Sequence, residues 1–591
     1  MKKAKPDRRA IKALLKIGKG EKTRGRILVF FLAAAVATLV SPVLSYLSKL
    51  IVDMLSDTYI SGSTEHSTAL FAVAIAIMVL AILSFAFHKV KEMEMIYINH
   101  ETTKRINTYI YDKLSRIRCE YYEDAKTYDT ITRVSANCPG IYSILNSLIT
   151  LAMAVVSTVS YGLLLGSIRW YFILLILFPN ALYVWLESKN LFDRYFMEIG
   201  QTKDKRRLNY MHTLFRDKKT NKEIRAFGLS DFLIAKYEAL RIKLHKQGTR
   251  LLMKQSILSF CLVVLSKIGL FACLFIVCVN CMQGTASVGD ITLVISAGAA
   301  FAASFGNIFA QVNSITGKAV YSNDFAAFEA MKCEESDKAD MPLFETLRFR
   351  DVSYRYPNAK ELALEGVSCE IKKGMTVALV GENGSGKTTF TKLMLGALHP
   401  SEGEIAVNGE LLSALLHGFR QRISYIPQSY GTFKMTLEDN LRLGKNDIDL
   451  EQYEPRFINF HDKLPEGYAT PLGNVYTGGV DLSGGEWQRI SIERALIRNG
   501  SEIYVMDEPA ASLDPLMESE LYEYFMKILK GKTLVITSHR LGACSLADHI
   551  FVFDQGKIVE QGSHDSLMKM RGKYYEMYTA QRSLYERKAA S

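Results

Sequence analysis

Two stretches in the second half of the chain combine residue types that handle phosphate and water. Residues 375–390 read MTVALVGENGSGKTTF, in which an apolar strand runs into a glycine-rich loop and a helical pattern follows. Glycines let the backbone turn its amides inward, and the amino terminus of a helix attracts an anion. The pattern predicts a phosphate-binding loop, in which Lys387 reaches the β- and γ-phosphates and the Thr388 hydroxyl ligates Mg²⁺. The residues expected to hold the nucleotide here are Gly381, Glu382, Asn383, Gly384, Ser385, Gly386, Lys387, Thr388 and Thr389.

The second stretch is an acidic pair at the end of an apolar strand. Residues 501–509 read SEIYVMDEP, so the strand delivers Asp507 next to the phosphate loop. There its carboxylate is expected to hold Mg²⁺, commonly through water. Glu508 follows and is positioned to orient or deprotonate the attacking water, because hydroxide is scarce at neutral pH. Together the two stretches predict hydrolysis of a nucleoside triphosphate.

These motifs occupy one part of a chain that is too long for a single core. With 591 residues it predicts several domains. Hydrophobic residues make up 49%, and nearly all the long apolar runs precede residue 320, whereas charge-rich sequence follows residue 340. We therefore expect a multi-domain fold, with an all-α six-helix transmembrane domain followed by an α/β P-loop NTPase domain. The expected parts are a basic cytoplasmic segment (1–26), the transmembrane domain (27–320), a linker (321–343) and the nucleotide-binding domain (344–591).

Six apolar segments are long enough to cross a bilayer, which takes about 20 residues. They cover 27–52, 68–88, 141–165, 170–187, 255–282 and 288–316. The fourth is short and contains Pro179-Asn180, so its limits are the least defined. An even number of spans returns the second half of the chain to the side of the amino terminus.

The charges of the loops agree with this topology. The three short loops expected outside (54–67, 166–169 and 283–287) contain one basic residue, Arg169, whereas the long loops near 89–140 and 188–254 are rich in lysine and arginine. Positive charge gathers on the cytoplasmic side. We therefore predict a multi-pass protein with both termini in the cytoplasm. The densely basic residues 1–26 border the first span, which favours contact with anionic lipid over nucleic-acid binding despite the net charge of +11.

The two long inner loops show apolar residues at helical spacing among alternating charges. We interpret them as spanning helices that continue into the cytoplasm; the alternative is two separate helical hairpins. Within the spans, Lys267 is a charge that should face a partner or a wet cavity. Four polar residues of the sixth span share one face and either line a cargo cavity or bond to other helices: Ser304, Asn307, Gln311 and Ser314.

Further along, residues 482–486 read LSGGE, between the phosphate loop and the acidic pair. In this order, behind an apolar half-chain, the motifs resemble the ATP-binding cassette (ABC) transporter family over nearly the whole chain. The arrangement is that of exporter-type half-transporters. The resemblance implies ATP and Mg²⁺ as ligands. It also implies that Tyr122–Arg133 and Leu214–Lys222 dock on cassettes as coupling helices.

The same resemblance assigns further site residues. Tyr356 would stack on adenine, Gln428 would sense Mg²⁺ and the attacking water, and His539 would contact the γ-phosphate. The signature residues Ser483, Gly484 and Gly485 would bind the γ-phosphate held by a second cassette, and Asp514 would link the two sites. Two departures stand out: residues 471–481 read PLGNVYTGGVD rather than an acidic TEVGERG-like form, and Glu486-Trp487 replaces a glutamine-centred continuation.

In the family that the chain resembles, asymmetric pairs usually carry a substituted catalytic glutamate in one subunit and a degraded signature in the other. Here Glu508 and Ser483–Gly485 are both intact, so the chain matches neither subunit of such a pair. A homodimer is therefore favoured over a heterodimer. The resemblance implies an ATP-driven exporter of a small or amphipathic cargo, such as a peptide, lipid or drug, in a bacterial plasma membrane. Two alternatives remain open, namely uptake through an exporter-like fold, as for metal chelates, and an ATP-dependent regulator without cargo.

Overall fold

The computed structural model describes residues 7–18, 20–61, 67–138, 140, 143–319, 321–334, 341–450, 452–474, 477–498, 500–509, 515–538 and 544–589. The chain forms two compact units. The first, called here the helical unit, consists of Met1–Leu114 and Thr130–Ala330. The second, the sheet unit, consists of Ser115–Asp129 and Met331–Ser591.

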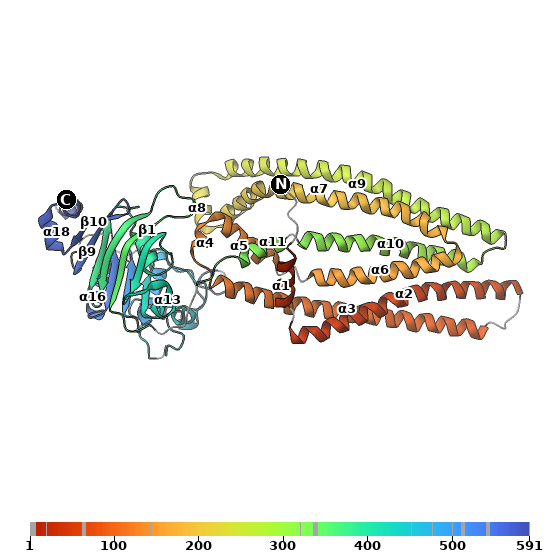
Figure 1. The fold of residues 1–591 in the computed structure, drawn as a ribbon, viewed down its shortest axis with the longest axis horizontal. Helices are drawn as coiled ribbons and strands as arrows, with labels where there is room; N and C mark the ends of the chain where they lie inside the picture. The colour runs from red at the N-terminus through yellow and green to blue at the C-terminus, as the bar shows by residue number, and fades with distance from the viewer. Residues whose placement is uncertain are drawn as a thin grey trace. The chain divides into compact units, whose positions relative to one another are not determined.

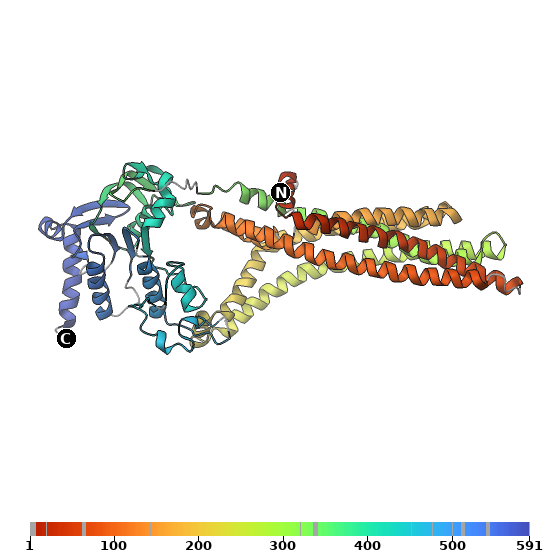
Figure 2. The ribbon, with the colours of Figure 1, turned by 90° about the horizontal axis from the view of Figure 1, so that it is seen from below.

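The helical unit is built from long helices that run side by side in two views (Figures 1 and 2). The long helices are α2 (Glu21–Ser61), α3 (Ser67–Leu114), α6 (Ser143–Ile168), α7 (Tyr171–Arg216), α9 (Ser230–Met282) and α10 (Val288–Ala319). The unit also contains the short helices α1 (Arg8–Gly18), α8 (Lys218–Ala226) and α11 (Tyr321–Glu329). Helix α5 (Ala125–Asn137) crosses the border between the two units.

The membrane-spanning segments agree with the sequence pattern. Among the described residues, five helical runs are long and apolar enough to cross a membrane, and they coincide with five of the six predicted segments: Thr23–Ile60, Ser67–Leu114, Ser143–Ile168, Ser230–Met282 and Val288–Glu329. The fourth predicted segment corresponds to the shorter apolar stretch Tyr171–Glu187 within α7.

The predicted extension of the spans is confirmed. Helix α3 continues unbroken from its apolar start to Leu114, and α7 and α9 continue their apolar stretches through 188–216 and 230–254. The alternative of separate hairpins is therefore wrong, because no turn interrupts these helices between their apolar and charged parts.

A glycine of α9 lies against a carbonyl that a proline leaves free in α7, so the two helices approach closely. Pro179 lies inside α7 and has no backbone N–H, so the carbonyl of Leu175 loses its helical donor. Gly269 of α9 lies against that carbonyl, and a Cβ atom there would come within 2.6 Å of the Leu175 oxygen. Small residues allow such approaches between helices in a membrane.

Polar side chains then hold the two antiparallel helices in register. Five contacts follow one another along the seam: Asn180–Ser266 (3.0 Å), Glu187–Ser259 (3.2 Å), Arg194–Gln255 (2.8 Å), Gln201–Gln247 (3.3 Å) and Asp204–Lys243 (2.8 Å). On α7 the first four lie seven residues apart, which keeps them on one face of the helix. Polar contacts at a helix seam select one register over its neighbours.

The polar face predicted in the sixth span divides into two parts. Two residues make interhelical bonds to α6, as Ser304 accepts from Thr158 at 3.0 Å and Ser314 lies 3.1 Å from the Ser147 hydroxyl. The other two bond to each other, as Gln311 donates to Asn307 at 3.0 Å. Half of this face therefore serves helix packing rather than a cavity. Lys267 is exposed on α9, and no described residue pairs with it.

The sheet unit contains two sheets among its described residues. The first is antiparallel, in the order β2 (Leu364–Lys372), β1 (Thr346–Tyr354), β4 (Glu402–Val407) and β5 (Glu410–Leu411). The second has the order β10 (Lys557–Gly562), β9 (His549–Asp554), β3 (Thr376–Gly381), β8 (Thr533–Thr537), β7 (Ile503–Asp507) and β6 (Ile423–Ile426). Between strands lie α12 (Lys387–Met394), α13 (Leu412–Arg422), α14 (Leu437–Arg442), α15 (Gly484–Ile497) and α16 (Pro515–Ile528). The short α4 (Glu120–Glu123) precedes the strands in the chain, and α18 (His564–Met570) and α19 (Lys573–Ala589) follow the last strand.

The register of the second sheet brings the two predicted motifs to one edge. Strand β8 lies between β3 and β7 and pairs with both in parallel. Its last residue, Thr537, stands opposite Leu379 of β3 and Asp507 of β7. Both strands therefore run to the same carboxyl edge, where β7 ends at Asp507 and β3 extends two residues further, to Gly381 in the phosphate loop. Ligands of α/β sheets bind at this carboxyl edge.

Candidate nucleotide site

The phosphate loop has the backbone that the sequence predicts. Gly381, Gly384 and Gly386 have φ angles of 154°, 82° and 107°, which L side chains rarely adopt. At Gly381 a Cβ atom would lie 2.3 Å from the carbonyl oxygen of Phe553. Gly386 immediately precedes α12, so the loop ends at a helix amino terminus. Such a turn directs backbone amides toward an anion.

Lys387 is folded back onto this loop. Its side chain is buried, and Nζ donates to the carbonyl oxygens of Gly381 and Glu382 at 2.8 Å each. Burial lowers the pKa of Lys387, whereas the charges of Glu508 and Asp507 oppose that shift. The ammonium thus lies among loop carbonyls at the place where phosphate oxygens would compete for it.

Asp507 is a buried carboxylate whose oxygens lack a hydrogen-bond donor among the described residues. The residue is 1% exposed, and neither side-chain oxygen accepts a hydrogen bond from any described residue. Burial, followed by the charge of Glu508, raises the pKa of Asp507 to about 6. Buried oxygens without a donor are costly unless an ion or water completes them. This donor set fits Mg²⁺, which prefers oxygen ligands and retains water.

Glu508 and Gln428 meet beside this carboxylate. Gln428 follows β6, and its Nε2 donates to Oε2 of Glu508 at 2.8 Å. Glu508 has a φ of 50°, an unusual angle for a residue with a side chain, and its amide donates to the Thr537 carbonyl at 3.0 Å. Strained conformations of this kind gather at functional sites. The two residues predicted to handle the attacking water are therefore in contact.

The other loop residues are less enclosed. Glu382, Asn383 and Thr388 are exposed, whereas Ser385 is buried and its hydroxyl bonds to no residue in the described part of the chain. Tyr356 is half-buried, and its hydroxyl lies 3.3 Å from the Oγ1 of Thr389 in α12. The predicted adenine residue is thus tied to the helix that follows the phosphate loop.

The signature begins a helix of its own. Ser483 caps α15, accepting from the Glu486 amide at 3.3 Å, while Glu486 accepts from the Ser483 amide at 2.7 Å. Such a reciprocal cap stabilises a helix start, and Glu486, the first departure, takes part in it. Trp487, the second departure, is buried in the core around α14 and α15. Ser483 and Gly484 are exposed, and among the described residues no hydrogen bond or ion pair joins 482–486 to the loop 381–389.

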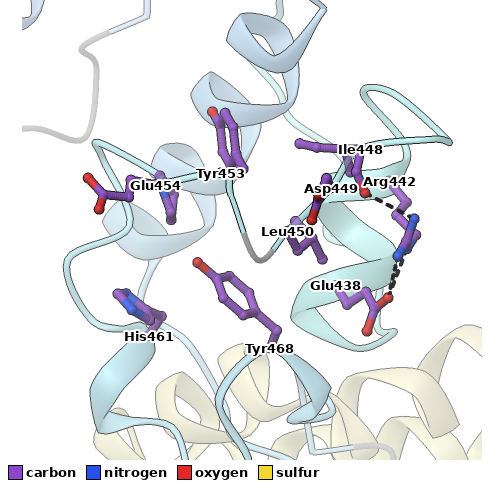
Figure 3. A pocket seen from close by; sticks show the side chains of 10 residues that line it. Glu438, Arg442, Ile448, Asp449, Leu450, Tyr453, Glu454, His461 and Tyr468 are labelled. Carbon is purple, nitrogen blue, oxygen red and sulfur yellow. Dashed lines mark hydrogen bonds and ion pairs between the residues drawn. The ribbon is translucent and has the colours of Figure 1, made fainter.

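Two predicted site residues, Asp514 and His539, lie outside the described residues. A pocket of about 830 Å³ lies elsewhere in the sheet unit, beside α14, where Arg442 pairs with Glu438 (Figure 3). No predicted site residue lines it.

Known families match both units. The ABC transporter transmembrane region matches residues 27–304, and the ABC transporter family matches residues 364–511. The chain belongs to the ABC transporter family. Its sheet unit contains an ATP-binding cassette, whose hydrolysis of ATP is coupled to transport, and its helical unit makes it a multi-pass membrane protein.

Individual relatives extend this result over most of the chain. The subtilin transport ATP-binding protein SpaT of Bacillus subtilis is 29% identical over 498 residues, which cover 80% of this chain and 79% of SpaT. The ATP-dependent lipid A-core flippase of Pectobacterium atrosepticum is 29% identical over 374 residues, covering 61% of this chain and 63% of the flippase. A bacterial Atm1-family ABC exporter with ATP bound has the same fold, with a TM-score of 0.73, 20% identity and coverage of 94% and 97%.

Sequence reasoning found the docking segment only in part. The expected segment Tyr122–Arg133 is broken at Asp124, where α4 ends and α5 begins. Within this segment Glu123 and Asp124 contact the ABC cassette, and Glu120, two residues before it, does so as well. The sequence feature that could have indicated these contacts is the acidic run EYYED at 120–124. It lies within the inner loop 89–140, where alternating charges at helical spacing make it inconspicuous. The docking of Leu214–Lys222, part of which forms α8, stays a prediction.

Proposed function

We propose that two copies of this chain form an ATP-driven exporter with two equivalent sites. Each ATP would lie between the phosphate loop of one copy and the LSGGE signature of the other. The exposed start of α15 carries this proposal, since Ser483 and Gly484 are exposed at a helix amino terminus and, among the described residues, have no hydrogen bond to the phosphate loop of their own chain. A helix amino terminus of this kind suits the γ-phosphate.

Within each site, Lys387 would leave the carbonyls of its loop for the β- and γ-phosphates. Tyr356 would stack on the adenine, and His539 would contact the γ-phosphate. Thr388, Asp507 and Gln428 would hold Mg²⁺, which when bound neutralises charge on the phosphate oxygens. Glu508 would accept the proton of the attacking water, and the bond from Gln428 holds its carboxylate in position.

The closing and opening of the two cassettes follow from the contacts that ATP makes. ATP would touch both the loop and the opposite signature only when the two cassettes are closed, so ATP shifts the equilibrium toward that state. Hydrolysis removes the contact and allows reopening. The long helices α3, α7 and α9 would carry the motion from the cassettes into the spans, and Asp514 would link the two sites.

The loop charges and the relatives support a direction, a membrane and a class of cargo for this transport. The fold neighbour is an exporter, and basic residues lie in the long loops, which supports export from the cytoplasm with both termini inside. A relative from Bacillus subtilis supports a bacterial plasma membrane. Relatives named for subtilin transport and for flipping a lipid A core support an amphipathic cargo of peptide, lipid or drug-like class.

The purified chain tests this proposal without any partner. We expect it to hydrolyse ATP alone in detergent or lipid, as a dimer with one nucleotide per copy in the trapped state. Hydrolysis that appears only with a co-expressed second half-transporter would contradict the symmetric dimer. Accumulation of a labelled amphipathic peptide in inside-out vesicles, but not in right-side-out vesicles, would establish export.

A further inference from the structure

One lysine outside the assigned site contacts both the adenine residue and the docking segment. Lys392 lies on α12, one and a half turns after the phosphate loop. Its Nζ donates to Oε1 of Glu123 at 2.8 Å and lies 5.6 Å from the centre of the Tyr356 ring. Both partners are partly shielded, with side-chain exposures of 33% for Lys392 and 38% for Glu123.

The surroundings keep this lysine charged and the tyrosine ring fixed. Burial alone would lower the pKa of Lys392, but the hydrogen bond to Glu123 and the neighbouring Tyr356 outweigh it, and the pKa is raised. The Tyr356 hydroxyl bonds to Thr389, and the ring meets Tyr354 edge-on at 5.0 Å and 87°. The ring is thus held on three sides.

The docking segment also contacts the residues that follow Tyr356. Asn358, two residues after Tyr356, donates from Nδ2 to Oδ1 of Asp124 at 2.9 Å. Glu123 and Asp124 are neighbours in a segment that directly follows the spanning helix α3 in the chain. Two adjacent carboxylates therefore hold residues 356–358. Asp124 contacts Asn358 directly, and Glu123 acts on Tyr356 through Lys392.

We propose that Lys392 is a positioning residue through which the adenine site and the docking segment affect each other. Glu123 fixes the ammonium beside the Tyr356 ring, and the ring is then preset to stack on the base. Coupling of this kind is reciprocal, so whatever the docked Glu123 adds to ATP affinity, bound ATP adds to the docking of Glu123. The inference rests on the proposed adenine role of Tyr356.

The test compares KM for ATP with inhibition by tripolyphosphate, a competitor without a base, in the full-length transporter. Glu123→Gln and Lys392→Gln should each raise KM for ATP about two- to fivefold, the size of a partly exposed ion pair or cation–π contact. Neither variant should change the inhibition constant of tripolyphosphate. Any change in kcat should be smaller than the change in KM. Lys392→Arg should restore KM. The control is Lys373→Gln, which breaks a 2.8 Å ion pair to Glu345 elsewhere in the sheet unit.

Double variants test whether the rise in KM for ATP depends on Lys392. Glu123→Gln should add nothing in a Lys392→Gln or a Tyr356→Ala background. Full additivity, or an equal shift in tripolyphosphate inhibition, would overturn the inference and indicate a general distortion of the phosphate loop. If Tyr356→Ala leaves KM unchanged, the adenine assignment fails and the inference with it. If Tyr356→Ala raises KM while Glu123→Gln does not, only the inference fails.

Discussion

In the sheet unit, strands β7 and β8 are buried along their whole length, whereas the most apolar stretch of α3 in the helical unit has no buried residue. The two regions face different solvents. In water an apolar strand must be covered, so a polar group left inside, such as Asp507, marks a site. In lipid an exposed apolar face is ordinary, and the informative positions are the polar bonds and close approaches between helices, as at Asn180 and Gly269.

The largest expected effect is at Glu508, the proposed general base of the sheet unit. Glu508→Gln should keep ATP binding and dimerisation but lower the hydrolysis rate by about 10²–10⁴-fold, because the general base is lost. Steady-state hydrolysis and equilibrium nucleotide binding measure the two separately. Glu410→Gln, at an exposed carboxylate on β5, is the control. Near-normal turnover of Glu508→Gln would remove the general-base assignment.

The next largest effect compares two glycines of the phosphate loop, one packed against a backbone oxygen and one with open space around it. Gly381→Ala places a Cβ atom 2.3 Å from a backbone oxygen, so we expect a loss of stability above about 3 kcal/mol and loss of nucleotide binding. Gly384→Ala meets no atom within 4 Å, and only its positive φ costs about 1–2 kcal/mol. Thermal unfolding of the two variants checks this order. Equal losses would show that the tight approach at Gly381 is unimportant.

The matching test in the helical unit concerns the seam between α7 and α9. Gly269→Ala should cost about 1–3 kcal/mol, since its Cβ would meet the Leu175 carbonyl at 2.6 Å and the helices must separate. On the same helix, Gly248 has open space, and Gly248→Ala should be neutral or stabilise by up to about 1 kcal/mol. Thermal inactivation in lipid compares the two. A destabilised Gly248→Ala with an unaffected Gly269→Ala would contradict the seam.

The smallest effect is one of pH at the docking segment. Glu120 accepts from the His399 amide at 2.8 Å and lies 3.1 Å from its ring nitrogen. The hydrogen bond from the His399 side chain lowers the pKa of Glu120 below 4.5, against burial. Its stabilisation is therefore present above pH 4.5 and is lost as the pH falls through the lowered pKa. We expect a change below about 1 kcal/mol, because both groups are partly exposed.

Hydrogen exchange of residues 117–124 across this pH range measures that loss. Protection that falls with acid in the parent protein but not in Glu120→Gln would sharpen the comparison, since it locates a titrating contact in the docking segment. Identical acid profiles in both proteins would contradict the role of Glu120.

The sequence predicted the two regions to different depths for the same physical reason. In the cassette, the loop from Gly381 to Thr388 and the pair Asp507-Glu508 are local patterns whose spacing fixes backbone and chemistry. The contact of Gln428 with Glu508, and the cap of Glu486 on Ser483, follow from strand register and helix start. In the helical unit, hydropathy located the spans, but it could not tell that Ser304 and Ser314 bond to α6. Those partners depend on which helices become neighbours, as do the contacts of Glu123 and Asp124 with the cassette.

The central claim is that each ATP site combines the loop of one copy with the signature of the other. Two singly inactive chains test it most directly. Lys387→Ala removes the phosphate lysine, and Gly484→Asp puts a carboxylate where the γ-phosphate should bind, at an exposed helix start that tolerates an acidic residue. Co-expressed, these two chains should regain hydrolysis, because one composite site in the mixed dimer is intact. A chain carrying both changes, paired with the parent chain, should give a mixed dimer without activity. No recovery in verified mixed dimers of the two single variants, or full activity in the second mixture, would contradict the account.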